Sequence, residues 1–259
     1  MSTTDTDAVL HEDRDERGVV TLTLNRPQVR NAFDDRLLSA LTEAATRLGA
    51  DETVRAVVLT GAGTAFCAGA DLNWMRSTAD ATAGETDDSS SFEDMLRAVH
   101  ELPMPVLARV NGHALAGASG LLGCADIAIA VRGARFGFTE ARLGLVPAMI
   151  SAYVLPRIGV THATRYFLTA EVFDSDRARE IGLVDEVCET EELDAVLGEM
   201  LERVVAAGGA AQREIKRLVP SVATARPQDS EQLRLDSIAR ARVSEEAQTR
   251  IAAFLSERG

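Results

Sequence analysis

The N-terminal part of the chain has the pattern of a strand, a helix and a second strand. Apolar and polar residues alternate over 19–24, and the sequence NRP over 25–27 ends this predicted strand. Asp34 or Asp35 can cap the helix that follows, in which apolar residues recur every three or four positions. The apolar run over 55–60 then predicts a second, buried strand.

Two further strands are predicted over 106–110 and 127–131, on either side of a segment of very small side chains. Strands that alternate with helices favour an α/β fold with largely parallel strands. No repeat with a clear period is found. The repeated strand with a glycine-rich turn after it is nevertheless compatible with a spiral of similar units.

Two regions depart from this alternation. Residues 76–92 are rich in Ser, Thr, Asp and Gly and offer little apolar surface, so we expect a mobile loop there. From about Leu193 the pattern is helical to the end, and its apolar stripes must pack on the body of the protein or on another subunit. We therefore divide the chain into a core over 1–192 and a helical region over 193–259.

The composition is that of a globular protein with an excess of acid. The 259 residues include 27 basic and 40 acidic side chains, for a formal net charge of −13. Nucleic acids and anionic membranes attract clustered Lys and Arg, so the charge argues against both as partners. The longest apolar stretch, 114–125, is shorter than the roughly 18 residues that span a bilayer. The acidic N-terminus is unlike a signal peptide, and we expect a cytoplasmic protein.

The three cysteines lie far apart in apolar surroundings, without CxxC or Cys/His ligand spacing: Cys67, Cys124 and Cys188. Buried free thiols are therefore expected, and no metal site is predicted.

Two glycine-rich turns, 65–73 and 111–120, each follow a buried strand and open a predicted helix. Their small side chains let a ligand approach the backbone, and the amides at a helix start carry partial positive charge. Two such amides directed at one oxygen would form an oxyanion hole. The alternative is that small residues simply allow a helix to pack closely on the sheet.

Other uses of these turns fit less well. The spacing of Gly112, Gly117 and Gly120 is not GxGxxG, and no GK[ST] follows 61–63, which argues against dinucleotide and phosphate loops. Ser119 does not lie in GxSxG, so we interpret it as a packing residue and not as a nucleophile.

Five short motifs occur in order between about residues 19 and 187, and together they resemble the enoyl-CoA hydratase/isomerase, or crotonase, superfamily. They lie at 25–32, 65–72, 111–117, 125–127 and 136–147. The resemblance implies an α/β, crotonase-like spiral of ββα units with a C-terminal helical trimerisation region. It also implies homotrimers or homohexamers, and an acyl-CoA thioester as the ligand.

The resemblance assigns the backbone amides of Ala70 and Gly117 to the oxyanion hole, where they would hold the thioester oxygen of an enolate. It assigns the coenzyme A groove mainly to backbone groups of Ala32, Ala68, Asp71 and Leu72. Asp71 can also serve as a helix N-cap, and the two roles can coexist.

Glu140 matches one of the two catalytic glutamates of the hydratases in this resemblance. Apolar neighbours would raise the pKa of its carboxyl, as suits a general acid or base; the candidates are Phe138, Leu143, Leu145 and Val146. The alternative is a surface glutamate near a helix start, paired with Arg142 or held by Thr139 as a cap.

The sequence departs from the best-known hydratases at Gly120, where they carry the second glutamate. We therefore assign Gly120 to the acyl pocket and expect an acyl-CoA hydratase with one catalytic glutamate. A double-bond isomerase and a catalytically reduced acyl-CoA-binding protein are the alternatives. No metal or separate cofactor is expected, since coenzyme A is part of the substrate. The segments 69–75, 102–106 and 140–153 resemble bacterial methylglutaconyl-CoA or carboxygeranoyl-CoA hydratases.

Few other polar residues are candidates for the site. His113 either faces the pocket or belongs to a structural turn. Trp74 is expected to pack as core or pocket wall. Three basic residues of the C-terminal helices either meet coenzyme A phosphates or lie on a solvated helix face: Arg213, Lys216 and Arg217.

Overall fold

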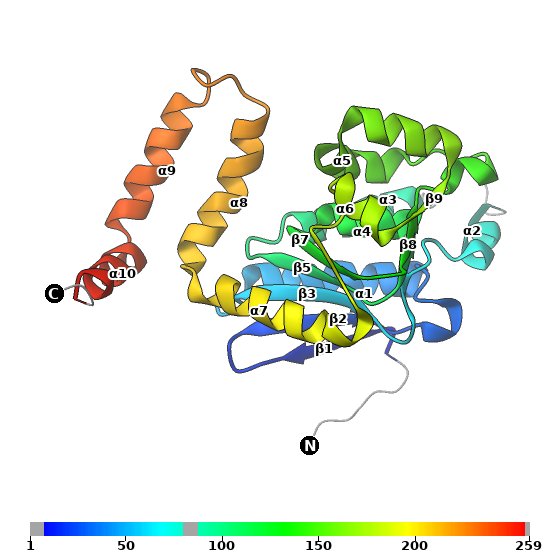
Figure 1. Ribbon diagram of the computed structural model, residues 1–259, viewed down its shortest axis with the longest axis horizontal. Coiled ribbons are helices and arrows are strands. Elements are labelled where there is room, and N and C mark those ends of the chain that lie inside the picture. Colours follow the sequence, from blue (N-terminus) through cyan, green and yellow to red (C-terminus); the bar gives the residue numbers. More distant parts are fainter. Residues whose placement is uncertain (1–7, 80–87, 257–259) are drawn as a thin grey trace.

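The computed structural model describes residues 8–79 and 88–256 and contains two sheets (Figure 1). The larger sheet has six strands in the order β1-β2-β3-β5-β7-β10. Strand β1 pairs antiparallel with β2, and all the other pairs of this sheet are parallel. The strands are β1 (Leu10–Arg14), β2 (Val19–Leu24), β3 (Ala56–Gly61), β5 (Val106–Val110), β7 (Ile127–Val131) and β10 (Glu186–Cys188).

The smaller sheet has the order β4-β6-β8-β9 and is built from strands of three residues each. Three long strands are each followed by a short strand and then a helix, so the units β3-β4-α2, β5-β6-α4 and β7-β8-α5 form a ββα spiral. These elements are β4 (Ala65–Cys67), β6 (His113–Leu115), β8 (Arg135–Gly137), β9 (Val172–Asp174), α2 (Leu72–Ala79), α4 (Gly117–Cys124) and α5 (Ala148–Thr169). The predicted α/β fold with largely parallel strands is confirmed.

Helix α1 (Asp35–Ala50) begins where the sequence predicts it. The side chain of Asp34 accepts a hydrogen bond from the Leu37 N–H at 2.9 Å, so Asp34 is the cap. The predicted apolar stripe of the helix is buried: Leu37, Leu38, Leu41, Ala44, Ala45 and Leu48. It packs on the main sheet and beside α3 (Asp88–His100).

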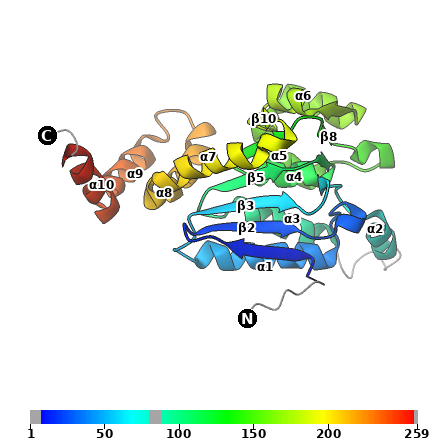
Figure 2. The same cartoon turned by 60° about the horizontal axis from the view of Figure 1, so that its bottom comes forward.

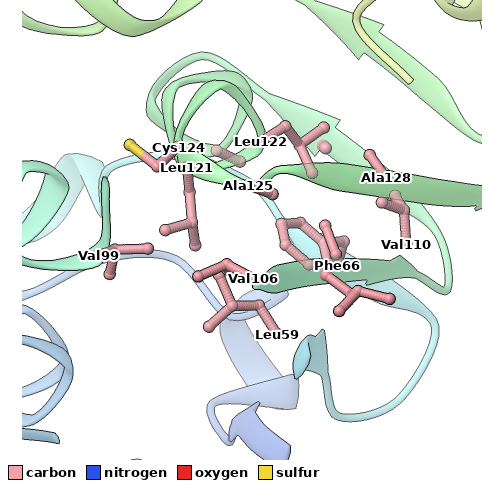
Figure 3. Close-up of a cluster of buried hydrophobic side chains, with 14 of the residues drawn as sticks. Leu59, Phe66, Val99, Val106, Val110, Leu121, Leu122, Cys124, Ala125 and Ala128 are labelled. Atoms are coloured by element: carbon pink, nitrogen blue, oxygen red, sulfur yellow. The ribbon is translucent and has the colours of Figure 1, made fainter. Parts of the chain in front are cut away.

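The core lies between the main sheet and the helices on its inner face. Figure 3 shows Leu59 and Val106 of the sheet facing Leu121 of α4, with Val99 of α3 beside them. The alanines of β7 and of the turn before it leave room for α4 to lie close to the strands. The free thiols of Cys67, Cys124 and Cys188 are buried, as predicted.

The prediction of a loop over 76–92 is wrong at both ends. Helix α2 continues to Ala79, and α3 already begins at Asp88, while residues 80–87 lie outside the described part of the chain. The reason is tertiary: Met95, Leu96 and Val99 bury one face of α3, and the helix continues from this packed part back to Asp88.

The predicted helical tail is confirmed. Helix α7 (Leu193–Ala206) packs on the body, whereas α8 (Gly209–Ala223), α9 (Glu231–Val243) and α10 (Glu245–Ser256) extend away from it (Figures 1 and 2). Their exposed apolar side chains include Ile215, Leu235, Ile238 and Ile251. The division at residue 193 into two units stays a prediction.

Lys216 joins α8 to the body. Its ammonium group donates to the Asp126 carboxylate at 2.6 Å and to the Met104 carbonyl at 3.0 Å, and its side chain is only 15% exposed. This arrangement contradicts the solvated helix face predicted for Lys216 as one alternative, and the phosphate contact stays a prediction. Arg213 likewise donates to the Val54 carbonyl, and Arg217 pairs with Glu214.

Among the described residues, no helix is long and apolar enough to cross a membrane. The same part of the chain holds no group of three or more His, Cys, Asp or Glu side chains placed to bind a metal ion. The remaining short elements are the 3-10 turns η1 (Pro27–Val29), η2 (Glu140–Leu143) and η3 (Thr190–Glu192), and helix α6 (Ser175–Glu180).

Candidate active site

The two glycine-rich turns lie side by side. Strands β4 and β6 pair in parallel, so the chain leaves both strands at the same edge of the smaller sheet. A Cβ atom built on Gly69 would lie 2.8 Å from the Leu115 carbonyl oxygen and 3.4 Å from the Gly117 nitrogen. Only glycine fits there, because its φ is also +89°. The structure thus brings Gly69, Ala70 and Gly117 together.

The amide of Ala70 is directed away from its neighbouring strand. Phe33 forms a parallel bridge with Ala70. The Phe33 N–H donates to the Gly69 carbonyl at 2.8 Å, and the Phe33 carbonyl accepts from the Asp71 N–H at 2.9 Å. In a parallel bridge the residue between the two bonded neighbours turns its own N–H to the other side. The Ala70 N–H is therefore available to a ligand.

The amide of Gly117 is the first of helix α4. The residue before it, Ala116, has a φ of +49°, and the Ser119 N–H already bonds to the Ala116 carbonyl. The first amides of a helix have no acceptor within the helix and carry partial positive charge. Two amides with these properties lie at one place, as the sequence predicts, while their use as oxyanion donors stays a prediction.

The loop that faces these turns is held by a partly buried arginine, Arg26, whose side chain is 13% exposed. Arg26 forms ion pairs with Asp34 at 2.9 Å and with Asp71 at 3.2 Å, and it also donates to the Ala32 carbonyl. Asn31, fully buried, donates to the Ala62 and Ala65 carbonyls, both at 2.9 Å. These bonds fix the loop against the turn that carries the candidate amides.

The side chain of Asp71 has a structural role. It accepts a hydrogen bond from the Asn73 N–H at 3.0 Å, which caps α2, and it holds Arg26. Only backbone groups of Asp71 are left to line a groove, together with those of Ala32, Ala68 and Leu72. The Ala68 N–H donates to the Arg30 carbonyl at 3.0 Å, and the Leu72 side chain is exposed.

Glu140 reaches the same edge of the smaller sheet. Strands β6 and β8 are parallel, and the Ala116 N–H donates to the Gly137 carbonyl at 2.8 Å. Glu140 follows Gly137 by three residues, and Gly117 follows Ala116 directly. A third turn, which carries a carboxylate, therefore lies next to the turn that carries the Gly117 amide.

The carboxylate of Glu140 has a buried oxygen, Oε2, with no hydrogen-bond partner. Burial raises the pKa of this carboxyl above its ordinary value, and a bond from its own backbone N–H opposes the shift only in part. Thr139 forms no side-chain cap, and Arg142 does not contribute to the pKa shift. A carboxylate with one buried oxygen that accepts no hydrogen bond matches the needs of an acid or base better than those of a surface ion pair.

The apolar shell predicted around Glu140 is only partly present. Phe138 is fully buried, but Leu143, Leu145 and Val146 are 57%, 43% and 74% exposed. The prediction for these three residues is wrong because η2 is a short turn ended by Gly144 in the left-handed conformation, and their side chains stay largely exposed.

Two apolar side chains, which sequence reasoning missed, lie against the glycines of helix α4. Phe92 of α3 lies over Gly117, 2.9 Å from a Cβ atom built there, and its ring is 5.5 Å from that of Phe33. Ile150 of α5 lies against Gly120, which is buried one helical turn after Gly117. In the sequence, Phe92 is the single large apolar residue at the end of a polar segment. This isolated position could have indicated that its side chain packs against the site.

The remaining polar candidates have structural roles. The Nδ1 atom of His113 accepts a hydrogen bond from the Arg135 N–H at 3.1 Å, so this residue belongs to the sheet and not to the pocket. Ser119 is buried and donates to the Gly137 carbonyl at 3.3 Å, as expected of a packing residue. Trp74 is partly buried against the core, as predicted.

Fold and site together define a protein of the crotonase type. The sequence model of the Enoyl-CoA hydratase/isomerase family matches residues 14–258, and the chain belongs to this family. It is 39% identical over 184 residues to the 1,2-epoxyphenylacetyl-CoA isomerase of Escherichia coli, covering 69% of each chain. It is 34% identical over 200 residues to the crotonyl-CoA hydratase of Syntrophomonas wolfei, covering 76% of each. The structure of an enoyl-CoA hydratase of Mycobacterium smegmatis superimposes with a TM-score of 0.88 at 35% identity, covering 96% of each chain.

Proposed function

We propose that the protein is an acyl-CoA hydratase that adds water to an α,β-unsaturated acyl-CoA thioester with Glu140 as its single catalytic carboxylate. The observation that carries the proposal is the meeting of three turns at one sheet edge. Two of them carry the amides of Ala70 and Gly117, and the third carries the carboxylate of Glu140, whose buried Oε2 has no hydrogen-bond partner.

In the proposed reaction the two amides hold the thioester oxygen while it gains negative charge. Ionised Glu140 takes a proton from water as the hydroxyl oxygen bonds to the β-carbon, and the double-bond electrons move to form an enolate. The protonated carboxyl then gives that proton to the α-carbon, and the enolate collapses to the hydrated thioester. One carboxylate with a raised pKa serves both steps.

Isomerisation is the second candidate, and Gly120 is the observation that favours it. An isomerase moves one proton between two carbons of the acyl group, which needs a single base. Ile150 leaves no space for a second carboxylate at position 120. Relatives of the chain are named for both kinds of reaction.

Coenzyme A occupies the groove formed by backbone groups of Ala32, Ala68, Asp71 and Leu72 in this proposal, and the acyl group extends past Gly120. Arg30 lies on the same loop with an exposed side chain and brings positive charge to the groove. The reaction uses no metal and no cofactor beyond the coenzyme A of the substrate. The apolar side chains of α8–α10 support assembly as a homotrimer or homohexamer.

The test is loss of the absorbance of a conjugated enoyl thioester, screened over straight, branched and carboxylated acyl-CoAs, with products separated by mass. A product heavier by one water supports hydration, whereas an isomer of unchanged mass supports the second candidate. Tight binding of acyl-CoA without any conversion across the panel would reject both reactions and leave a binding protein.

Replacement of Glu140 by Gln tests the role of the carboxylate. We expect turnover to fall by about 10²–10⁴-fold, the usual contribution of a positioned acid or base. Affinity for the thioester should change little, since the amides of Ala70 and Gly117 are untouched. Near-normal turnover in the Gln variant would show that another group moves the proton.

A further inference from the structure

Ile150 fills the space beside Gly120. The isoleucine is 2% exposed and lies in the first turn of α5, and Gly120 is buried on α4. A Cβ atom built on Gly120 would lie 2.3 Å from Cγ2 of Ile150, 2.8 Å from its Cβ and 3.5 Å from its Cα. Real Cβ atoms essentially never approach a heavy atom closer than 3.0 Å.

These distances make positions 120 and 150 a dependent pair. Any side chain at 120 collides with Ile150, and alanine at 150 would still leave a Cβ atom 2.8 Å away. Only glycine at 150 removes both close atoms, and the remaining 3.5 Å to its Cα is an ordinary contact. With the backbone as it stands, a Cβ atom fits at 120 only if residue 150 is glycine.

We propose that Ile150 is the residue that limits this site to one carboxylate, by occupying the space that a glutamate at position 120 would need. The inference rests on the proposed acyl-CoA chemistry. Position 120 lies one helical turn after Gly117, on the same side of α4, so a carboxylate there would lie near the thioester. With Ile150 in place, Glu140 alone must take the proton from water and return it to the α-carbon.

The pair is tested by exchange, with Gly120→Glu, Ile150→Gly and the double variant. We expect Gly120→Glu alone to lower both the melting temperature and turnover, because the new side chain does not fit. The double variant should regain most of the melting temperature lost by Gly120→Glu. It should also hydrate a short unbranched enoyl-CoA about tenfold faster than the Ile150→Gly variant does. This increase in rate is smaller than the full contribution of a positioned acid or base.

Two controls separate the effect of free space beside position 120 from the effect of a charged side chain there. Gly120→Glu with Ile150→Ala loses the contact at 2.3 Å but keeps the Cβ atom at 2.8 Å, so it should regain less stability than Gly120→Glu with Ile150→Gly. Gly120→Gln with Ile150→Gly fits equally well but carries no ionisable group. It should show the regained stability without the gain in hydration, and its pH profile should lack the second ionisation that the Glu variant acquires.

The proposal is overturned if Gly120→Glu and Gly120→Gln, each combined with Ile150→Gly, give the same hydration rate and pH profile. It is equally overturned if Ile150→Ala relieves Gly120→Glu as well as Ile150→Gly does. These comparisons do not depend on the natural enzyme. A wild-type protein that converts no enoyl-CoA would contradict the proposed function, while a gain of Glu over Gln in the double variants would still support the role of Ile150.

Discussion

At the scale of single residues, Glu140 connects chemistry with stability. Burial raises the pKa of its carboxyl, so the folded protein binds this proton more tightly than the unfolded chain does. The stability that this group contributes is fully present below the ordinary pKa of glutamate and is lost as pH rises through the higher pKa of the folded state. Above that range, the fold must keep a carboxylate ionised with one oxygen that has no hydrogen-bond partner.

Glu140→Gln should therefore be more stable than the natural protein at pH 8, with an advantage that shrinks towards pH 5. Gln has the same shape without the charge that must be buried. Denaturant unfolding at several pH values measures the difference. Glu199→Gln, at an exposed position of α7, is the control and should show no comparable dependence. An advantage that stays constant with pH would contradict this account of Glu140.

Gly69 carries a second residue-scale prediction. Gly69→Ala places a Cβ atom 2.8 Å from the Leu115 carbonyl in a backbone with φ +89°. Gly133 has a similar φ of +85° but open space around it, so Gly133→Ala isolates the backbone strain of about 1–2 kcal/mol. We expect both variants to lose stability, and only Gly69→Ala to lose enoyl-CoA turnover as well. Equal turnover in the two variants would argue against a role for this turn in the site.

At the scale of elements, an ion pair between Lys216 and Asp126 contributes to the attachment of α8 to the body. Asp126 accepts both the Val106 N–H at 2.7 Å, at the start of β5, and the ammonium of Lys216 from α8. One carboxylate thus joins a core strand to the first of the projecting helices. Arg250 of α10 donates in turn to the carbonyls that end α7, which ties the outer helices to the same junction.

Lys216→Met should lower the free energy of unfolding by about 1–3 kcal/mol, the range for a hydrogen bond to a charged group. It should also expose the junction between α7 and α8 to protease. The matched control is Arg203→Met, which breaks an exposed pair with Glu199 on α7 and should change stability by less than about 0.5 kcal/mol. Equal effects of the two substitutions would show that Lys216 does not hold α8.

At the scale of the whole molecule, the projecting helices leave apolar surface uncovered in a single chain. Leu235, Ile238 and Ile251 are each about half exposed, at 54%, 51% and 50%. Exposed apolar side chains on helices that project from the body are typical of a protein interface.

We therefore expect light scattering to give the mass of a trimer or hexamer of the 27.7 kDa chain at micromolar concentration. Ile238→Lys should shift that mass towards the monomer, because a charge would be buried in the interface. Leu168→Lys places the same charge on an exposed apolar position of α5 and should leave the mass unchanged. A single-chain mass for the unmodified protein would contradict the proposed assembly.

Sequence reasoning succeeded where a signal is local and failed where it is not. The strands over 106–110 and 127–131 are mostly apolar runs, interrupted only by Arg109, and both are confirmed. Strand β1 was missed because most of its residues are polar and exposed, and β4, β6 and β8 are too short to show a period. The helical ends of the segment 76–92 were missed because their stability comes from the buried face of α3.

The sequence by itself determined the strands β2, β3, β5 and β7, a cap of α1 at Asp34 or Asp35, the two turns of small residues and the motif that contains Glu140. All of these depend on interactions between residues close together in the chain. Tertiary structure alone decided that the two turns meet, because the pairing of β4 with β6 aligns their ends. It also decided that Ile150 fills the space at Gly120 and that Lys216 pairs with Asp126, 90 residues earlier. Contacts of this kind join residues that only the packing of the whole chain brings within reach of each other, so no local pattern records them.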